Sequence, residues 1–153
     1  TRVGLQDAEY MPAPIKFEAG TQRVSQAVAF AAAVRYLQHL GMENVEAWEH
    51  ELGARLVEGV QKIEGVRLLG PADPSKRAGL VALAIEGVHP HDVGQLLDTQ
   101  GIAVRVGHHF AQPLHRCAGV TASTRASTYI YNTTEDVDAF LKALAEVRPY
   151  FGF

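Results

Sequence analysis

Cysteine is almost absent from this sequence, since Cys117 is the only one among 153 residues. An internal disulfide is therefore excluded, and the composition fits a reducing, cytoplasmic setting. No apolar run approaches the roughly 18 residues that a membrane-spanning helix needs, and no signal-peptide pattern opens the chain. The net charge is only −3, so we expect neither nucleic acid nor a membrane as the main partner.

The rest of the composition is that of an ordinary folded domain. Apolar residues make up 47% of the chain and charged residues 20%, which argues against disorder. A chain of this length can form one domain with its own core. Because the sequence begins with Thr1 rather than Met, we expect it to be a piece of something longer.

The first part of the chain predicts an extended segment followed by two helices. Residues 1–23 have no sustained period, and Gly20-Thr21 is expected to form a turn that can hold a phosphate or simply cap a helix. Apolar residues then recur at helical spacing from Val24 to Leu40. A second helix is predicted after Asn44, a favoured N-cap residue.

The remaining sequence alternates predicted strands and helices. Strands are predicted at residues 66–69, 80–85, 101–106 and 125–131, and helices after His89 and Asn132. The continuous apolar run at 80–85 is typical of a strand covered on both faces. This order predicts an α/β or α+β sandwich of about four mixed strands covered by helices.

One loop carries the most unusual side chains. Arg105 lies in a predicted strand that ends in His108-His109-Phe110, between a glycine and a proline. A strand that delivers such residues into a loop is a common way to place a site on a rigid frame. Phe110 stands out because it is bulky and apolar where its neighbours suggest a reactive residue.

The histidines and the cysteine are candidate metal ligands, because imidazole and thiolate both bind zinc. The candidates are His89, His91, His108, His109, His115 and Cys117. A single cysteine cannot form a Cys-x-x-Cys pair, and the histidines follow no recognised ligand spacing. We therefore predict no metal site.

Two arginines are candidates for substrate binding. Arg125, at the head of a predicted strand, can clamp a carboxylate bidentately or form a surface ion pair, and Arg105 has the same two interpretations. Cys117 fits a packed thiol better than a nucleophile. None of the four lysines lies in the apolar setting that activates an amine. The residues alone thus predict a carboxylate site without a catalyst.

Several motifs together resemble the C-terminal part of class V, fold-type I enzymes that use pyridoxal 5'-phosphate (PLP), most nearly the SufS-type (group II) cysteine desulfurases. They are Phe17-Glu-Ala-Gly20-Thr21, Arg105-Val-Gly-His108-His109, Pro113-Leu114, Arg125-Ala-Ser127 and Tyr131-Asn132. The resemblance is collinear over essentially the whole chain. It implies that residues 24–153 form the C-terminal domain of a cytoplasmic enzyme that takes sulfur from L-cysteine, gives L-alanine and a persulfide, and serves iron–sulfur cluster assembly.

The resemblance also implies roles for single residues in the loop and sheet. The position of Phe110 corresponds to the nucleophilic cysteine of the family, so this sequence lacks the thiol that carries the persulfide. Arg125 is expected to bind the substrate carboxylate, Arg105 to lie in the active site, and His108 and His109 to contact substrate.

Further roles concern the cofactor and partners. Gly20 and Thr21 are expected to reach the PLP phosphate of a partner subunit, which implies a homodimer. His91 aligns with the region where relatives engage a sulfur acceptor of the SufU or SufE type. The lysine that holds PLP belongs to a preceding large domain, so this chain alone is expected to be inactive. Alternatives are a selenocysteine lyase or another class V PLP enzyme, and a non-catalytic module that binds a sulfur acceptor.

Overall fold

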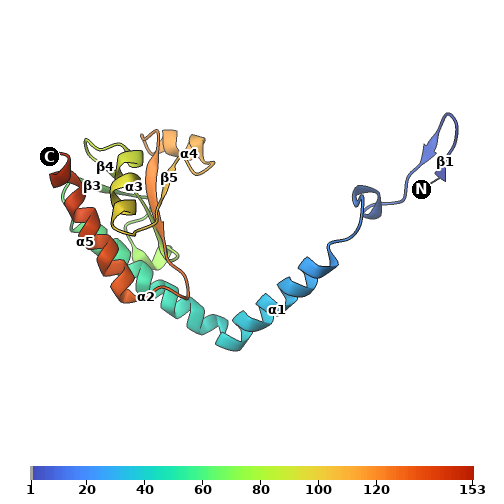
Figure 1. Ribbon diagram of the computed structural model, residues 1–153, viewed down its shortest axis with the longest axis horizontal. Helices are drawn as coiled ribbons and strands as arrows, with labels where there is room; N and C mark the ends of the chain where they lie inside the picture. The colour runs from blue at the N-terminus through green and yellow to red at the C-terminus, as the bar shows by residue number, and fades with distance from the viewer. Residues whose placement is uncertain (1) are drawn as a thin grey trace. The chain divides into compact units, whose positions relative to one another are not determined.

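The computed structural model describes residues 2–153, which form two units, residues 2–41 and Met42–Phe153 (Figure 1). In the first unit, strand β1 (Arg2–Val3) pairs antiparallel with β2 (Ala8–Glu9). A short 3-10 helix, η1 (Ile15–Phe17), precedes helix α1 (Val24–Leu40). The first unit is thus an extended segment followed by one long helix.

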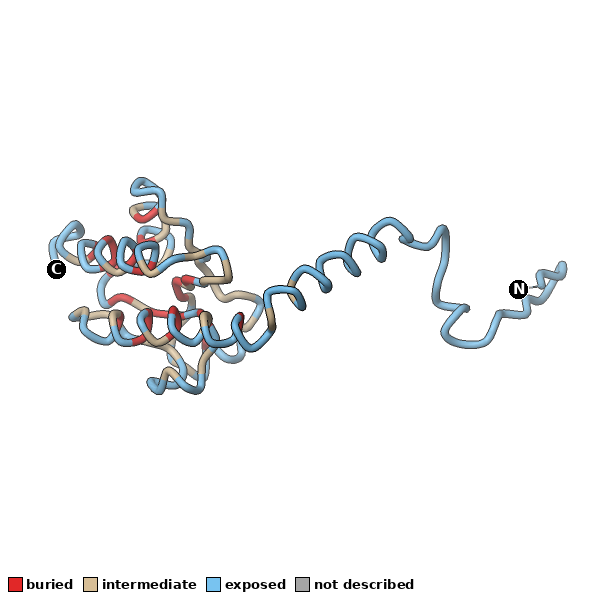
Figure 2. Tube along the Cα trace, turned by 90° about the horizontal axis from the view of Figure 1, so that it is seen from below, coloured by how far each residue is buried: buried red, intermediate tan, exposed pale blue. Residues whose placement is uncertain are grey.

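Helix α1 has the predicted bounds, but its apolar residues are not buried. Figure 2 shows every buried position of residues 2–153 within the second unit. Gly41 ends α1 as predicted, with a φ of 85° that a glycine adopts without strain. Gly20-Thr21 does not cap this helix, because the N-cap position is Arg23 and no side chain bonds there.

The second unit contains a four-stranded sheet in the order β3-β4-β6-β5. Its strands are β3 (Val66–Leu69), β4 (Leu80–Ile85), β5 (Arg105–Gly107) and β6 (Ser123–Ser127). The predicted α/β architecture of four strands with helices is confirmed. Every neighbouring pair is antiparallel, however, rather than of mixed direction.

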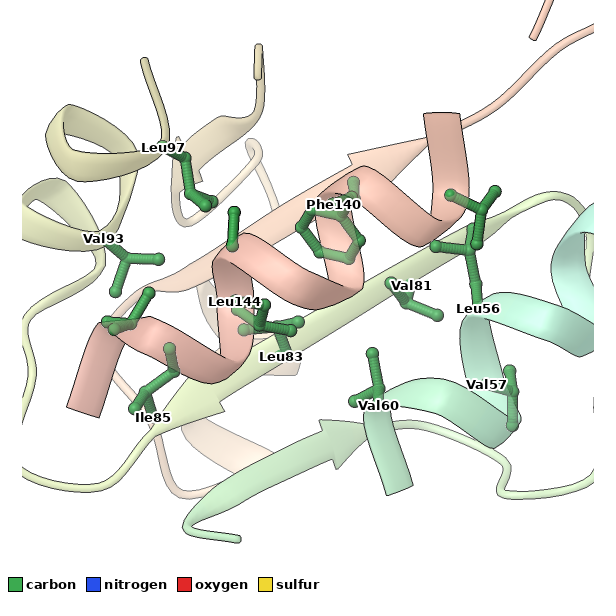
Figure 3. Close-up of a cluster of buried hydrophobic side chains, with 14 of the residues drawn as sticks. Leu56, Val57, Val60, Val81, Leu83, Ile85, Val93, Leu97, Phe140 and Leu144 are labelled. Atoms are coloured by element: carbon green, nitrogen blue, oxygen red, sulfur yellow. The ribbon is translucent and has the colours of Figure 1, made fainter. Parts of the chain in front are cut away.

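Three helices supply the apolar side chains that pack on one face of this sheet. They are α2 (Met42–Gln61), α3 (Pro90–Thr99) and α5 (Thr134–Tyr150). Val81, Leu83 and Ile85 of β4 alternate toward the helices and join their residues in one core (Figure 3). Ala82 and Ala84 on the other face are only partly buried, so β4 is not covered equally on both faces as its apolar run predicts.

Several predicted boundaries are wrong for local reasons. Helix α2 begins at Met42, so Asn44 lies inside it rather than at the N-cap. Strand β5 has only three residues, and β6 ends at Ser127 before a turn at residues 130–131. Helix α5 begins as predicted after Asn132, where Thr133 and Asp136 form a reciprocal capping box. The short helices η2 (Pro74–Lys76) and α4 (Gln112–Cys117) were not predicted.

Within residues 2–153, no helix combines the length and apolar character needed to span a membrane.

Truncation of a core leucine gives a direct test of this packing. Leu144 of α5 is 1% exposed, and Leu144→Ala should lower the free energy of unfolding by about 2–5 kcal/mol because it leaves a cavity. Trp48, the only tryptophan, reports unfolding of this unit because its Nε1 donates to the Asn132 carbonyl at 3.1 Å. The matched control is Leu114→Ala, since that side chain is 67% exposed and the change should be nearly neutral. Equal urea midpoints for the two variants would contradict this core.

Candidate functional site

The pairing of β5 with β6 places two arginines side by side. Arg105 lies directly opposite Arg125, and Gly107 lies opposite Ser123. These residues alternate with Thr124 and Ala126, which face the helices, so the arginines occupy the other face of the sheet. Like charges directly opposite one another repel, and an anion between them relieves that repulsion. The pair therefore fits a carboxylate.

Arg125 has an unused donor. It lies third of five residues in β6 rather than at the head of the strand as predicted, and it is partly buried. Its Nε is buried and has no hydrogen-bond partner among the described residues. A buried donor without a partner costs free energy, so this atom favours a ligand that brings an acceptor.

The loop after β5 turns sharply at its histidine pair. His109 and Phe110 have φ values of 50° and 56°, in the left-handed region that non-glycine residues rarely adopt. The Phe110 amide donates to His108 Nδ1 at 3.2 Å, and the Ala111 amide donates to the His108 carbonyl at 2.8 Å. These bonds hold the turn and leave the Phe110 side chain 95% exposed at its tip.

The two adjacent histidines have different environments. The His108 ring serves the turn itself, whereas His109 Nε2 lies 3.1 Å from the Ser123 hydroxyl in β6. Desolvation is the main cause that lowers the pKa of His109, followed by the positive charge of Arg125 and then by His115. His109 is therefore neutral at pH 7 and stands next to the arginine pair. Its Nδ1 is a second buried atom without a partner among residues 2–153.

This environment predicts a pH dependence of stability. Because folding lowers the pKa of His109, the unfolded chain binds the proton more tightly, so stability falls as the pH drops below about 6.5. Between pH 7.5 and 5.5, His109→Gln should therefore lose less stability in urea titrations than the wild-type chain. His50→Gln is the control, since that ring is largely exposed. Parallel losses for the wild-type chain and His109→Gln would contradict the assigned environment.

The structure does not bring all the predicted residues together. His91 is exposed on α3, where it lines a groove of about 390 Å³ with Val106, whose side chain lies on the opposite face of the sheet from Arg105. Gly20 and Thr21 belong to the first unit, at an exposed turn. Among the described residues, no three histidine, cysteine or acidic side chains are placed to hold a metal ion.

Two residues of the site were missed by sequence reasoning. Ser123 is fully buried beneath the loop and bonds both His109 and His115. The sequence indicates His115 only as a candidate metal ligand. In the structure it lies on the short helix α4 and is only 7% exposed. The hydrogen bonds of these residues depend on how the loop folds over the sheet, so no residue spacing in the sequence predicts them.

Comparison with known proteins accounts for nearly the whole chain. The family model described as aminotransferase class-V matches residues 1–140. The chain belongs to the class-V aminotransferase family. Its relatives include probable cysteine desulfurase 2 of Mycobacterium leprae (strain TN), which is 48% identical over 150 residues, 98% of this chain and 36% of the relative. The chain thus spans little more than a third of that relative's length.

Solved structures of cysteine desulfurases show the same fold. An apo cysteine desulfurase from Thermococcus onnurineus NA1 has a TM-score of 0.85 at 38% identity, over 96% of this chain and 36% of that chain. The cysteine desulfurase CsdA from Escherichia coli, in an S-sulfonic acid form, has a TM-score of 0.86 at 33% identity, over 98% and 37%. These neighbours are fold-type I PLP enzymes, so the predicted class-V family and the predicted fold are confirmed.

Class-V aminotransferases depend on PLP, and two features of this chain fit the anionic groups at such a site. Gly20 has a φ of 84° and no atom within 4 Å of the place a Cβ would take, which leaves the Gly20-Thr21 backbone open to a phosphate. Arg125 offers its unpaired Nε to a carboxylate. Taken separately, the Gly20-Thr21 backbone suits a phosphate and Arg125 suits a carboxylate.

Proposed function

We propose that this chain is the C-terminal part of a SufS-type cysteine desulfurase, a cytoplasmic enzyme that takes sulfur from L-cysteine for iron–sulfur cluster assembly. The observation that carries the proposal is the opposed pair Arg105 and Arg125 beside an exposed loop tip at Phe110. The relatives named above are cysteine desulfurases by name, which supports this general chemistry.

In this proposal the open face of the sheet binds the substrate. Arg125 donates from its guanidinium to the carboxylate of L-cysteine, and Arg105 adds positive charge from the opposite strand. His108 and His109 lie at the edge of the substrate site, on the side of the loop. Because His109 is neutral, it can accept a hydrogen bond from substrate without repelling the ammonium group.

Position 110 is the place where sulfur transfer would occur. A cysteine there would attack the substrate sulfur as a thiolate and form a sulfur–sulfur bond while the substrate carbon–sulfur bond breaks. The electron pair of the broken bond would stay on the substrate carbon, which would take up a proton, so that a persulfide and L-alanine result. Phe110 has no sulfur atom, so this chain offers no persulfide carrier at the loop tip. The phenyl ring also occupies the volume into which a thiol would reach.

The remaining assignments concern the cofactor and partners. Gly20 and Thr21 would hold the PLP phosphate of a partner subunit in a homodimer, and bound PLP would supply the electron sink for the reaction. All four lysines of this chain are exposed, and none belongs to the cluster around Arg125, so the lysine that binds PLP would come from outside residues 1–153. His91 would contact a sulfur acceptor of the SufU or SufE type.

A chimera tests the proposal. The 150 matched residues of the Mycobacterium leprae relative are replaced by their counterparts from this chain, so that the rest of the relative supplies what this chain lacks. We expect a folded dimer with the visible absorbance of protein-bound PLP. Gel filtration and a visible spectrum measure both, and the unmodified relative is the control. A folded chimera that binds no PLP would reject the proposal.

A second candidate function is a non-catalytic module that binds a sulfur acceptor. The exposed Phe110 at the loop tip and the exposed Leu114 on α4 favour it, because exposed apolar side chains suit a protein interface. Calorimetry against acceptor proteins, with and without zinc, distinguishes it from the enzyme. A selenocysteine lyase, which would share the same carboxylate site, is distinguished by its preference for selenocysteine over cysteine in the chimera.

A further inference from the structure

Two buried side chains, Ser123 and His115, and the partly buried ring of His109 form one series of hydrogen bonds under the loop. The Ser123 hydroxyl lies 3.1 Å from His109 Nε2 and 3.0 Å from His115 Nε2. The other ring nitrogen of His115, Nδ1, lies 3.0 Å from the Ala111 carbonyl oxygen. Ser123 is fully buried, and His115 is 7% exposed, so water does not compete for these bonds.

The direction of each bond follows from its chemistry. A carbonyl oxygen only accepts, so His115 must carry a proton on Nδ1. In the neutral ring, His115 Nε2 then accepts, and the Ser123 hydroxyl donates to it. The serine oxygen is left to accept from His109, which must carry its proton on Nε2.

These hydrogen bonds hold the loop on both sides of residue 110. On one side they hold the ring of His109, and on the other they hold the carbonyl of Ala111, to which the His115 amide also donates at 3.0 Å. Their central residue, Ser123, belongs to β6, where it pairs with Gly107 in the sheet. Of the two left-handed residues, His109 carries the first anchor and Phe110 lies between the two anchors.

We propose that Ser123 and His115 are positioning residues that clamp the loop around residue 110 and fix the direction in which its side chain projects. Left-handed conformations are unfavourable for non-glycine residues, so the turn persists only if its surroundings hold it. The clamp supplies that hold through His109 and Ala111. The importance of residue 110 for sulfur transfer rests on the proposed function, whereas the clamp itself does not.

Nuclear magnetic resonance of the full chain tests the clamp. Long-range nitrogen–proton spectra should show His115 protonated on Nδ1 and His109 on Nε2. The backbone order parameter of Phe110 should be near the rigid value of about 0.85. A His109 ring protonated on Nδ1, or a wild-type loop as mobile as an unstructured segment, would overturn the proposal.

Two variants separate positioning from a general role in folding. Ser123→Ala removes only the central hydroxyl, and His115→Leu removes both ring bonds while keeping an apolar volume in place. Each should free the His109 tautomer and lower the Phe110 order parameter below about 0.6, with Trp48 fluorescence unchanged. The matched control is His50→Leu, because His50 is exposed on α2 and makes none of these hydrogen bonds. A loop that stays rigid in both folded variants would overturn the clamp, and this outcome is independent of whether the chimera binds PLP.

Discussion

Phe110→Cys in the chimera should restore alanine production from L-cysteine, whereas the chimera with Phe110 should stay at background. Removal of a catalytic nucleophile costs up to about 10⁶ in kcat in well-studied enzymes, so we expect a gain of at least about 100-fold. Position 110 suits sulfur transfer, because its side chain is 95% exposed at the tip of the turn. A side chain there can reach a ligand that lies beyond the arginine face of the sheet. Alanine released over time measures the gain.

Two controls test whether the gain requires the cysteine sulfur or only the loss of the phenyl ring at position 110. Phe110→Ser removes the ring without adding sulfur and should leave the chimera inactive. Phe110→Cys in a Cys117→Ser background should be as active as Phe110→Cys alone, because Cys117 lies on α4 and is not part of the proposed transfer. If the Phe110→Ser chimera matched the cysteine variant, the role assigned to position 110 would be wrong.

Arg125→Ala should have the next largest effect, and it should act mainly on substrate affinity. Loss of a charge-assisted, partly buried contact to a carboxylate costs about 2–5 kcal/mol, or about 30- to 5000-fold in kcat/KM. We expect Arg125→Lys to recover only part of this loss, because an ammonium group cannot form the bidentate pair. Steady-state kinetics of the Phe110→Cys chimera measure both variants.

The matched control for Arg125 lies in the same unit. Arg55 on α2 pairs with Asp138 at 2.6 Å in an exposed ion pair, so Arg55→Ala should change kcat/KM little. A loss in Arg125→Ala no larger than that in Arg55→Ala would show that the carboxylate binds elsewhere.

Much of the fold follows from local signals in the sequence. The helix at Val24–Leu40 and the strands at Val66–Leu69 and Leu80–Ile85 have the predicted bounds, because periodicity and flanking glycines define them. The apolar residues that recur along α1 are nevertheless not buried. Helical spacing identifies an apolar stripe but does not tell what covers it.

The site was only partly predictable, because its geometry comes from strand pairing. Arg105 and Arg125 were candidates from their residue type, but only the β5–β6 register places one opposite the other. The hydrogen bonds through the buried Ser123 could not be predicted from the sequence, since a serine in a polar run resembles any surface serine. The roles of Phe110 and Arg125 came from family resemblance and stay predictions.

The most direct test of the central claim is the intact mass of the Phe110→Cys chimera after one turnover with L-cysteine. The account predicts a gain of one sulfur atom, located on residue 110 by peptide mapping and removed by a thiol reductant. An unmodified residue 110 in a chimera that binds PLP and consumes L-cysteine would contradict it.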